Sequence, residues 1–230
     1  MAKRTAGRGA VEALAMFAAV PVVLVVASAL AVRARLLPVS IGYDLLTLQV
    51  AWWLSFLAAA AGLLALILAV RNFGKLGLVA LVALVLGVGS LAGFGWQKAR
   101  LLSGPGENVS TDLNEVPGFG RMRSDAGGGA AVGADVCPGA RPLMKQVAPQ
   151  VAGWALEQAG FQVRGTGVGR ADGSRDSFFF GFTHDAVIRI RPGRTDVRVA
   201  ARDGRPHGGE ACRLATRISE ALHTDATAGG

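Results

Sequence analysis

The sequence predicts three transmembrane helices followed by a two-layer α+β domain, in which two helices cover an antiparallel sheet. Two observations carry this prediction. Apolar residues make up 51% of the 230 residues, and before residue 100 they form three uncharged runs that are each long enough to cross a bilayer. After residue 137 they follow strand and helix periodicities, in short segments bounded by glycine and proline.

The first apolar run, residues 13–32, holds no charged side chain and has basic residues on both sides. This pattern is typical of a membrane-spanning helix. The competing interpretation is a cleaved signal peptide, because Ala27-Ser28-Ala29 offers small residues for cleavage. The run exceeds the roughly 7 to 15 apolar residues of a signal peptide, and two further spans follow, so we predict an uncleaved anchor.

The second and third runs, residues 45–70 and 76–96, are separated by only five residues. A connection this short predicts an antiparallel helical hairpin. Small residues recur four positions apart at two places, Ala58 with Gly62 and Gly89 with Gly93. Such spacing lets helix backbones approach closely. We interpret it as ordinary bundle packing, because the chain is rich in alanine and glycine.

The net charge of +8 belongs to the membrane part of the chain. Residues 1–106 hold nine basic and two acidic residues, whereas residues 107–230 hold fifteen basic and fourteen acidic residues. Basic residues that flank apolar spans are expected in membrane proteins, so the charge gives no support to nucleic-acid binding. The spans contain almost no ionisable residue, which disfavours a transporter.

Basic residues near the span ends predict the orientation. Five lie on the side of the N-terminus and four on the other side: Lys3, Arg4, Arg8, Arg71 and Lys75 against Arg33, Arg35, Lys98 and Arg100. The positive-inside rule then predicts an N-terminus inside and a C-terminal domain outside. For a multi-pass protein of a bacterial inner membrane, the domain is periplasmic.

Changes in composition divide the chain into four segments. Residues 1–100 form the membrane anchor, residues 101–136 a connector arm with a low-complexity loop, residues 137–224 the α+β domain, and residues 225–230 a disordered tail. The connector is too irregular in sequence for a regular element, so we expect an extended arm.

A sheet is predicted over residues 178–202. Alternation places Phe178, Phe180 and Phe182 on one face of a first strand, and a polar turn at residues 183–185 then reverses the chain. The second strand buries Ile188 and Ile190. The third strand follows a loop at Pro192-Gly193-Arg194 and buries Val197, Val199 and Ala201. The opposite face of these strands is cationic.

Two amphipathic helices are predicted to cover the apolar face. One occupies residues 142–159, where apolar residues recur at helical spacing before Gly160, and Phe161 then begins a strand. The other has Ala211, Ala215, Ile218 and Leu222 on its inner side. With both helices on the apolar face, the arginine face of the sheet is left open.

Residues 108–222 carry motifs that resemble a bacterial family catalogued as domain of unknown function fourteen ninety-nine. The matching segments are Ser110-Thr111-Asp112 with Pro117 and Phe119, Phe180-Gly181-Phe182-Thr183-His184-Asp185, Arg189, and the strand from Asp196 to Arg202. The resemblance implies an α+β fold and a setting in the cell envelope. The chain departs from the family pattern where His184 and His207 stand in place of acids, and where Val199 and Ala201 replace two serines.

The arginines of the predicted sheet are the main candidate binding residues: Arg189, Arg191, Arg198 and Arg202. Guanidinium groups on a rigid sheet suit the recognition of carboxylates or phosphates. The alternative is a solvated face neutralised by neighbouring aspartates. His184 and Asp185 add an acid/base pair or, in the structural interpretation, simply a polar turn.

The sequence predicts no metal site and no cofactor. Its three histidines and two cysteines include neither a CxxC nor an HxxxH pattern.

Cys137 and Cys212 form a candidate disulfide in an oxidising compartment, and the alternative is two small buried thiols. No nucleophile motif of familiar form is present.

These features predict a membrane-anchored envelope protein that acts as a non-enzymatic binding or scaffold module. Its expected partners are membrane lipid and an anionic ligand or acidic protein surface, recognised by the cationic sheet face. The sequence sets no oligomeric state. The alternative hypothesis is a hydrolase-like envelope enzyme that uses His184, Asp185 and nearby arginines.

Overall fold

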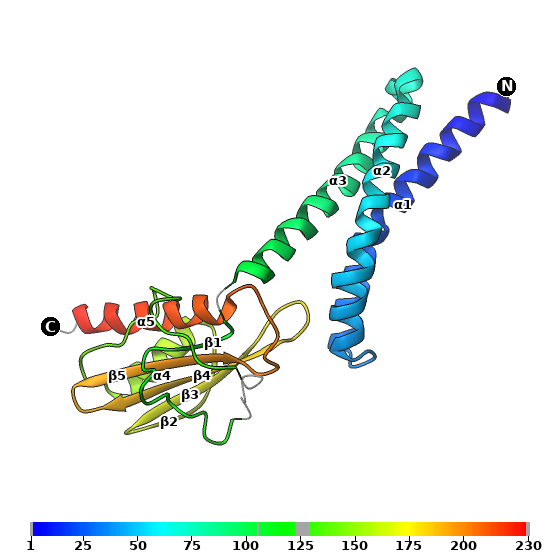
Figure 1. Cartoon of the computed structure of the whole chain (residues 1–230). Helices are drawn as coiled ribbons and strands as arrows, with labels where there is room; N and C mark the ends of the chain where they lie inside the picture. Colours follow the sequence, from blue (N-terminus) through cyan, green and yellow to red (C-terminus); the bar gives the residue numbers. More distant parts are fainter. Residues whose placement is uncertain (1, 105, 123–128, 229–230) are drawn as a thin grey trace. The chain divides into compact units, whose positions relative to one another are not determined.

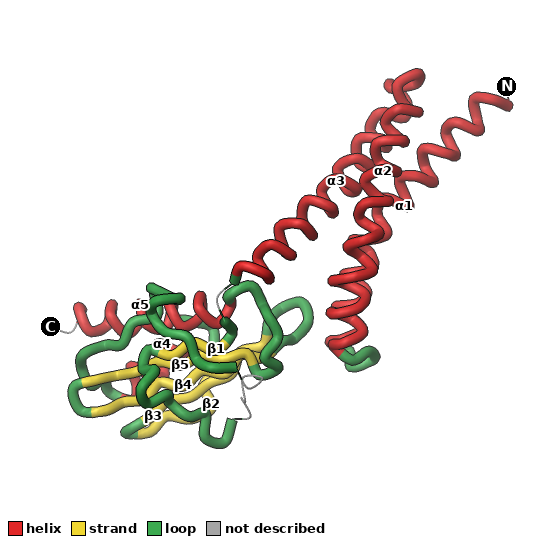
Figure 2. The backbone as a smooth tube through the Cα atoms, viewed as in Figure 1, coloured by secondary structure: helices red, strands yellow, loops and turns green. Residues whose placement is uncertain are grey.

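The computed structural model describes residues 2–104, 106–122 and 129–228. It comprises two compact units, Met1–Ala99 and Arg100–Gly230. The first is built from helices and the second is an α+β domain, which confirms the predicted fold class (Figure 1, Figure 2).

The membrane unit contains the helices of the three predicted spans. These are α1 (Ala2–Arg33), the π-helix η1 (Ser40–Ala51), α2 (Trp52–Ala69), the short 3-10 helix η2 (Val70–Asn72) and α3 (Phe73–Ser103). Within the described residues, three helical stretches are long and apolar enough to cross a membrane: Arg8–Arg33, Ser40–Ala69 and Phe73–Leu102. The chain is therefore a membrane protein.

Gly62 of α2 and Gly87 of α3 allow these two helices to lie side by side (Figure 1). A Cβ atom added at Gly62 would lie 2.7 Å from the carbonyl oxygen of Ala83, and one added at Gly87 would overlap the carbonyl oxygen of Ala58. The first predicted small-residue pair therefore lies at a helix interface. The second pair has no atom within 4 Å of either added Cβ, so it lies outside this interface.

Replacing Gly62 or Gly87 with alanine is expected to destabilise the membrane unit by about 1–3 kcal/mol, because the added methyl group meets backbone atoms that cannot move aside. Titration with dodecyl sulfate, followed by tryptophan fluorescence in a background in which Trp96 and Trp154 are replaced by phenylalanine so that Trp52 and Trp53 report, measures this loss. The matched control is Gly89→Ala, which adds the same methyl group in open space and is expected to be neutral or slightly stabilising. Equal effects at all three positions would contradict the packing argument.

The α+β domain contains one antiparallel sheet of five strands in the order β1-β5-β4-β3-β2. The strands are β1 (Asn108–Ser110), β2 (Gln162–Gly167), β3 (Arg170–Asp176), β4 (Thr183–Arg191) and β5 (Arg194–Ala201). Helices α4 (Pro149–Gln158) and α5 (Glu210–Ala228) cover one face of this sheet (Figure 1). The core between helices and sheet includes Leu156, Ile188, Val199, Leu214 and Ile218.

The hairpin of β4 and β5 follows the predicted alternation. Ile188 pairs with Val197 and faces the core, whereas Arg189 pairs with Asp196 on the opposite face. The connecting loop contains Gly193 with φ +71°, a left-handed conformation that glycine adopts without strain.

The predicted strand over residues 178–182 is wrong. On the side of β4 away from β5, the neighbouring strand is β3. Its polar sequence RADGSRD gave little strand signal, because its strand conformation depends on pairing with β2 and β4. The phenylalanines instead form the turn after β3, where Phe178 is 82% exposed and Phe180 stacks on Phe182. The predicted turn at residues 183–185 is the first part of β4.

The predicted helix over residues 142–159 is too long, because α4 begins only at Pro149. Ala148, the residue before this proline, is extended, as expected for a residue whose helical conformation the proline ring disfavours. Leu143 instead forms an isolated antiparallel bridge with Thr195, and its side chain still packs in the core.

The connector arm is part of the domain rather than a separate segment. Its first residues, up to Ser103, are the end of α3. Asn108–Ser110 form β1, an edge strand paired with β5, and Phe119 packs with Val187 and Ala200 on the sheet face opposite the helices. The prediction of an open arginine face is therefore wrong, because the arm lies across it. Residues 123–128, which include the start of the low-complexity loop predicted over residues 126–134, lie outside the described residues, and Val132 of this loop bridges to Val109.

Helix α5 continues through most of the predicted disordered tail, as far as Ala228, and residues 229–230 lie outside the described residues. Cys212, in the first turn of this helix, forms a disulfide with Cys137, and their Cα atoms are 5.7 Å apart. The bridge ties the segment that precedes α4 to the N-terminal end of α5.

Candidate functional site

The predicted binding arginines Arg189 and Arg191 lie in an ion-pair network centred on the fully buried Asp196. One carboxylate oxygen of Asp196 accepts hydrogen bonds from Arg189 Nη2 at 3.3 Å and Arg191 Nη2 at 2.6 Å. Its other oxygen accepts from Arg194 Nε at 2.8 Å. Asp112 of the arm accepts from the same Nη2 atoms of Arg189 and Arg191, each at 2.8 Å. This network fastens the arm to the sheet.

Arg198 and Arg202 are also held within the domain. Arg198 donates to the side chain of Asn108 at 3.0 Å and to the carbonyl oxygen of Pro117 at 2.9 Å, and its guanidinium lies over the ring of Phe119. Arg202 donates to both carboxylate oxygens of Asp185, at 3.0 and 2.7 Å. All four predicted arginines are therefore bound to groups of the protein itself.

The network lowers the pKa of Asp112. Burial raises this pKa, but hydrogen bonds from the Glu115 backbone and from Arg191, together with the charge of Arg194, lower it by more, so it lies below the ordinary value. The ionised carboxylate is the form that holds the arm.

Acidification is expected to release the arm. The pKa of Asp112 is lower in the folded than in the unfolded state. Asp112 therefore contributes its full stabilisation at a pH above its pKa in the unfolded state, and this contribution is lost as the pH falls through its pKa in the folded state. The urea midpoint of the domain should therefore fall between about pH 5 and pH 2. Asp112→Asn should show a shallower pH dependence, whereas Asp135→Asn, at an exposed position, should follow the wild type. Parallel curves for all three proteins would contradict this role.

His184 and Asp185 do not act as a pair, because consecutive residues of β4 point to opposite faces of the sheet. Asp185 lies on the arginine face and binds Arg202. His184 lies on the face covered by helices and meets two groups that sequence reasoning did not select, Glu107 and His207. The acid/base pair on a turn is therefore not formed.

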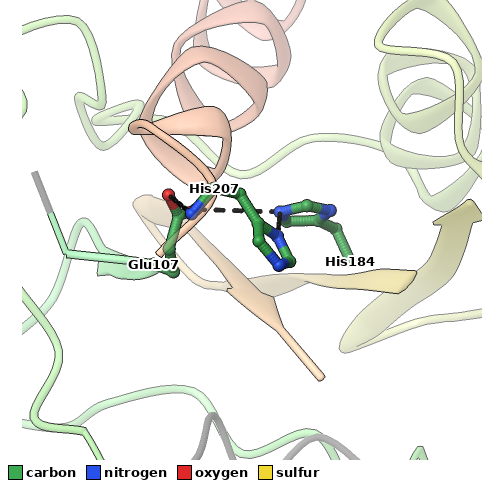
Figure 3. Close-up of side chains that lie close together, drawn as sticks. All are labelled: Glu107, His184 and His207. Carbon is green, nitrogen blue, oxygen red and sulfur yellow. Dashed lines mark hydrogen bonds and ion pairs between the residues drawn. The ribbon is translucent and has the colours of Figure 1, made fainter. Parts of the chain in front are cut away.

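Glu107, His184 and His207 form a compact cluster near the N-terminal end of α5 (Figure 3). His184 Nε2 lies 3.3 Å from His207 Nδ1 and 3.7 Å from Glu107 Oε2. The side chains are only 2%, 5% and 6% exposed for His184, His207 and Glu107, respectively. Three ligand-capable groups are thus brought together out of bulk water.

Strand pairing explains how Glu107 and His184 meet. Glu107 precedes β1, and its carbonyl oxygen accepts a hydrogen bond from the backbone of Ala201 at the end of β5. Ala201 pairs in turn with His184 on β4. His207 comes from the loop between β5 and α5, which folds back over this end of the sheet.

The carboxylate of Glu107 caps α5 from a distant part of the chain. Oε1 accepts hydrogen bonds from the backbone N–H groups of His207 and Gly209 at 2.9 and 2.8 Å, and Oε2 accepts from that of Ala211 at 3.0 Å. Burial raises the pKa of Glu107, but the bonds from His184 and these backbone groups lower it by more. Glu107 is thus held as a carboxylate in a fixed orientation.

The ring of His207 is also held in place. It stacks on Phe182 with ring centroids 4.3 Å apart, and its Nε2 atom lies 3.3 Å from Asp203 Oδ1. Burial raises the pKa of Asp203, but contacts with His207 and Arg205 bring it below its ordinary value. The other ring nitrogen, Nδ1, points toward His184.

A small pocket of about 190 Å³ lies beside the cluster. Its lining is formed largely by glycines: Leu101, Gly104, Gly106, Glu107, Gly204, Pro206 and Gly208. Glu107 is the member of the cluster that lines this pocket.

Sequence reasoning missed Glu107 and His207 and placed His184 on a turn. The three residues lie far apart in the chain, so no motif spacing links them. Two of the three histidines of the chain, His184 and His207, lie in this cluster.

Comparisons with protein-family models, with curated proteins and with solved structures give no match for this chain.

Proposed function

We propose that this protein is a membrane-anchored binding module whose α+β domain holds a small ligand at the cluster of Glu107, His184 and His207. One observation carries the proposal: three ligand-capable side chains from three separate segments converge, at least 94% buried, beside a pocket. Concave sites with a few convergent polar groups are where small ligands bind.

The structural requirements of α5 do not account for this cluster. Capping needs only a hydrogen-bond acceptor for the free N–H groups of the first turn, and Glu107 supplies it. Two buried imidazoles against that carboxylate add a desolvation cost that apolar side chains would avoid. Buried ionisable groups with displaced pKa values concentrate at functional sites, which favours a ligand for this one.

Binding is favoured over catalysis by the contacts of the two rings. Within the described residues, His184 and His207 contact each other, Glu107, Asp203 and Phe182. A mechanism of the cysteine-histidine type requires a free thiol within reach of a base, and both cysteines are joined in the disulfide. The cluster therefore resembles a set of ligands more than a catalytic triad.

Native mass spectrometry of the full-length protein in detergent tests this function. Wild-type protein isolated from its own membranes is expected to retain a ligand mass, and the double variant His184→Asn, His207→Asn is expected to lack it. His223→Asn is the matched control, because His223 lies on α5 and its Nδ1 atom contacts the carbonyl oxygen of Ser219. A wild-type mass equal to that of the bare polypeptide would count against the proposal.

The domain is further proposed to face the periplasm of a bacterial inner membrane. The five-to-four count of basic residues supports this orientation, and so does the disulfide, since disulfides persist in oxidising compartments. A C-terminal alkaline phosphatase fusion should be active and a green fluorescent protein fusion dark. The opposite pattern would place the domain in the cytoplasm.

A further inference from the structure

We infer that the ligand is a zinc ion, bound by His184 Nε2, His207 Nδ1 and the carboxylate of Glu107. This inference rests on the binding function proposed above and names the chemistry of its ligand. It goes against the sequence-based expectation of no metal site, which depended on the spacing of residues along the chain.

The distances between the donor atoms support a tetrahedral ion. One candidate donor atom from each of the three residues lies within 4.8 Å of the others. With zinc bonds of about 2.0–2.1 Å, the donor atoms of a tetrahedral site lie about 3.3 Å apart. The two ring nitrogens are 3.3 Å apart, and Glu107 Oε2 is 3.7 Å from His184 Nε2. Small side-chain movements are enough to close the site around an ion.

The types of donor favour zinc over the common hard cations. Two imidazole nitrogens and one carboxylate suit borderline divalent metals, whereas magnesium and calcium take sets of oxygen ligands. A set of two histidines and one glutamate is also the type that leaves a fourth zinc position open. The pocket that Glu107 helps to line is large enough to hold a water molecule.

The groups around the donors would orient them for an ion. Metal-bound histidines commonly place their second nitrogen against a carboxylate, and His207 Nε2 lies 3.3 Å from Asp203 Oδ1, which is an ion-pair distance but not a hydrogen bond in this structure. Stacking on Phe182 restricts rotation of the same ring. Three backbone N–H groups fix the orientation of the Glu107 carboxylate.

Metal titration of the full-length protein tests this inference. The protein carries no polyhistidine tag, is stripped with a chelator in detergent, and is titrated with Co²⁺ and then Zn²⁺. We expect one ion per chain, with intense visible bands of tetrahedral Co²⁺ that Zn²⁺ removes. X-ray absorption of the zinc-loaded wild type should show two imidazole ligands at about 2.0 Å, a readout that requires no variant.

Variants then assign the ligands. His184→Asn and His207→Asn should each weaken Zn²⁺ affinity by about 100-fold or more, and Asp203→Asn, which removes an orienting carboxylate, by about 10- to 100-fold. His223→Asn should change affinity less than about twofold. Amide hydrogen exchange of residues 129–228 confirms that each variant is folded.

The outcomes separate this inference from the proposed function. If the wild type binds no Zn²⁺ but retains another mass that depends on the two histidines, the zinc assignment is wrong and the binding function stands. If the double histidine variant binds Zn²⁺ as tightly as the wild type, the ion lies elsewhere and the assignment is also wrong. If the wild type retains neither zinc nor another ligand, both proposals fall.

Discussion

Replacing Asp196 with asparagine is expected to lower the free energy of unfolding of the α+β domain by about 3 kcal/mol. Asp196 is fully buried and accepts hydrogen bonds from Arg189, Arg191 and Arg194. Without its charge, the three guanidinium groups lose their shared buried counterion and depend on the carboxylates of the arm. Because Asp112 accepts from two of them, the cost lies at the lower end of the range for a broken buried ion pair.

The matched control for this substitution is Glu115→Gln. Glu115 pairs with Arg189 and Arg191, but its side chain is 70% exposed, so its loss should cost less than about 1 kcal/mol. Urea unfolding of the full-length protein, followed by hydrogen exchange in residues 129–228, measures both changes. In Asp196→Asn the arm residues 107–122 should also exchange faster. Equal costs for the two substitutions would show that burial of Asp196 does not set the strength of the network.

Reduction of the disulfide between Cys137 and Cys212 is expected to destabilise the domain by about 4 kcal/mol, because a cross-link across 75 residues restricts the unfolded chain. The effect should be visible as a lower urea midpoint in the presence of a reductant. It should be largest for α5 and the segment before α4, which the bridge joins.

The double variant Cys137→Ala, Cys212→Ala controls for effects of the reductant. It should start at the stability of the reduced protein and show no further change when a reductant is added. Alkylation of protein taken directly from the membrane, followed by mass spectrometry, reports whether the bridge is present there. Two alkylated cysteines in that material would contradict the disulfide and weaken the periplasmic assignment.

The elements with strong local patterns were predictable. Long uncharged apolar runs predicted the spans, because a bilayer requires them irrespective of the rest of the fold. Alternation predicted the inward faces of β4 and β5, and helical spacing predicted the inner side of α5 with Ile218 and Leu222. In these segments apolar side chains face the core and polar side chains face away from it, so the spacing of apolar residues in the sequence predicts the buried face.

The elements with weak local patterns were missed. The polar strand β3 is held by pairing with β2 and β4, and β1 is only three residues long and depends on β5. Phenylalanines at alternate positions suggested a strand over residues 178–182, but they lie in a turn where Phe180 stacks on Phe182. Alternation alone does not distinguish a strand from a turn that packs its aromatic rings on one another.

The sequence by itself determined the membrane spans, the α+β class, the apolar face of the β4–β5 hairpin and the presence of arginines opposite it. Only the tertiary structure decided what those arginines contact and that Glu107, His184 and His207 form a cluster. The arm lies across the arginine face because its carboxylates form ion pairs there, Asp112 with Arg189 and Glu115 with Arg191. Glu107 and His184 meet because β5 pairs with β1 on one side and β4 on the other, and His207 reaches them from the loop between β5 and α5. Contacts of this kind join distant segments through long-range pairing, which leaves no periodicity in the chain from which to predict them.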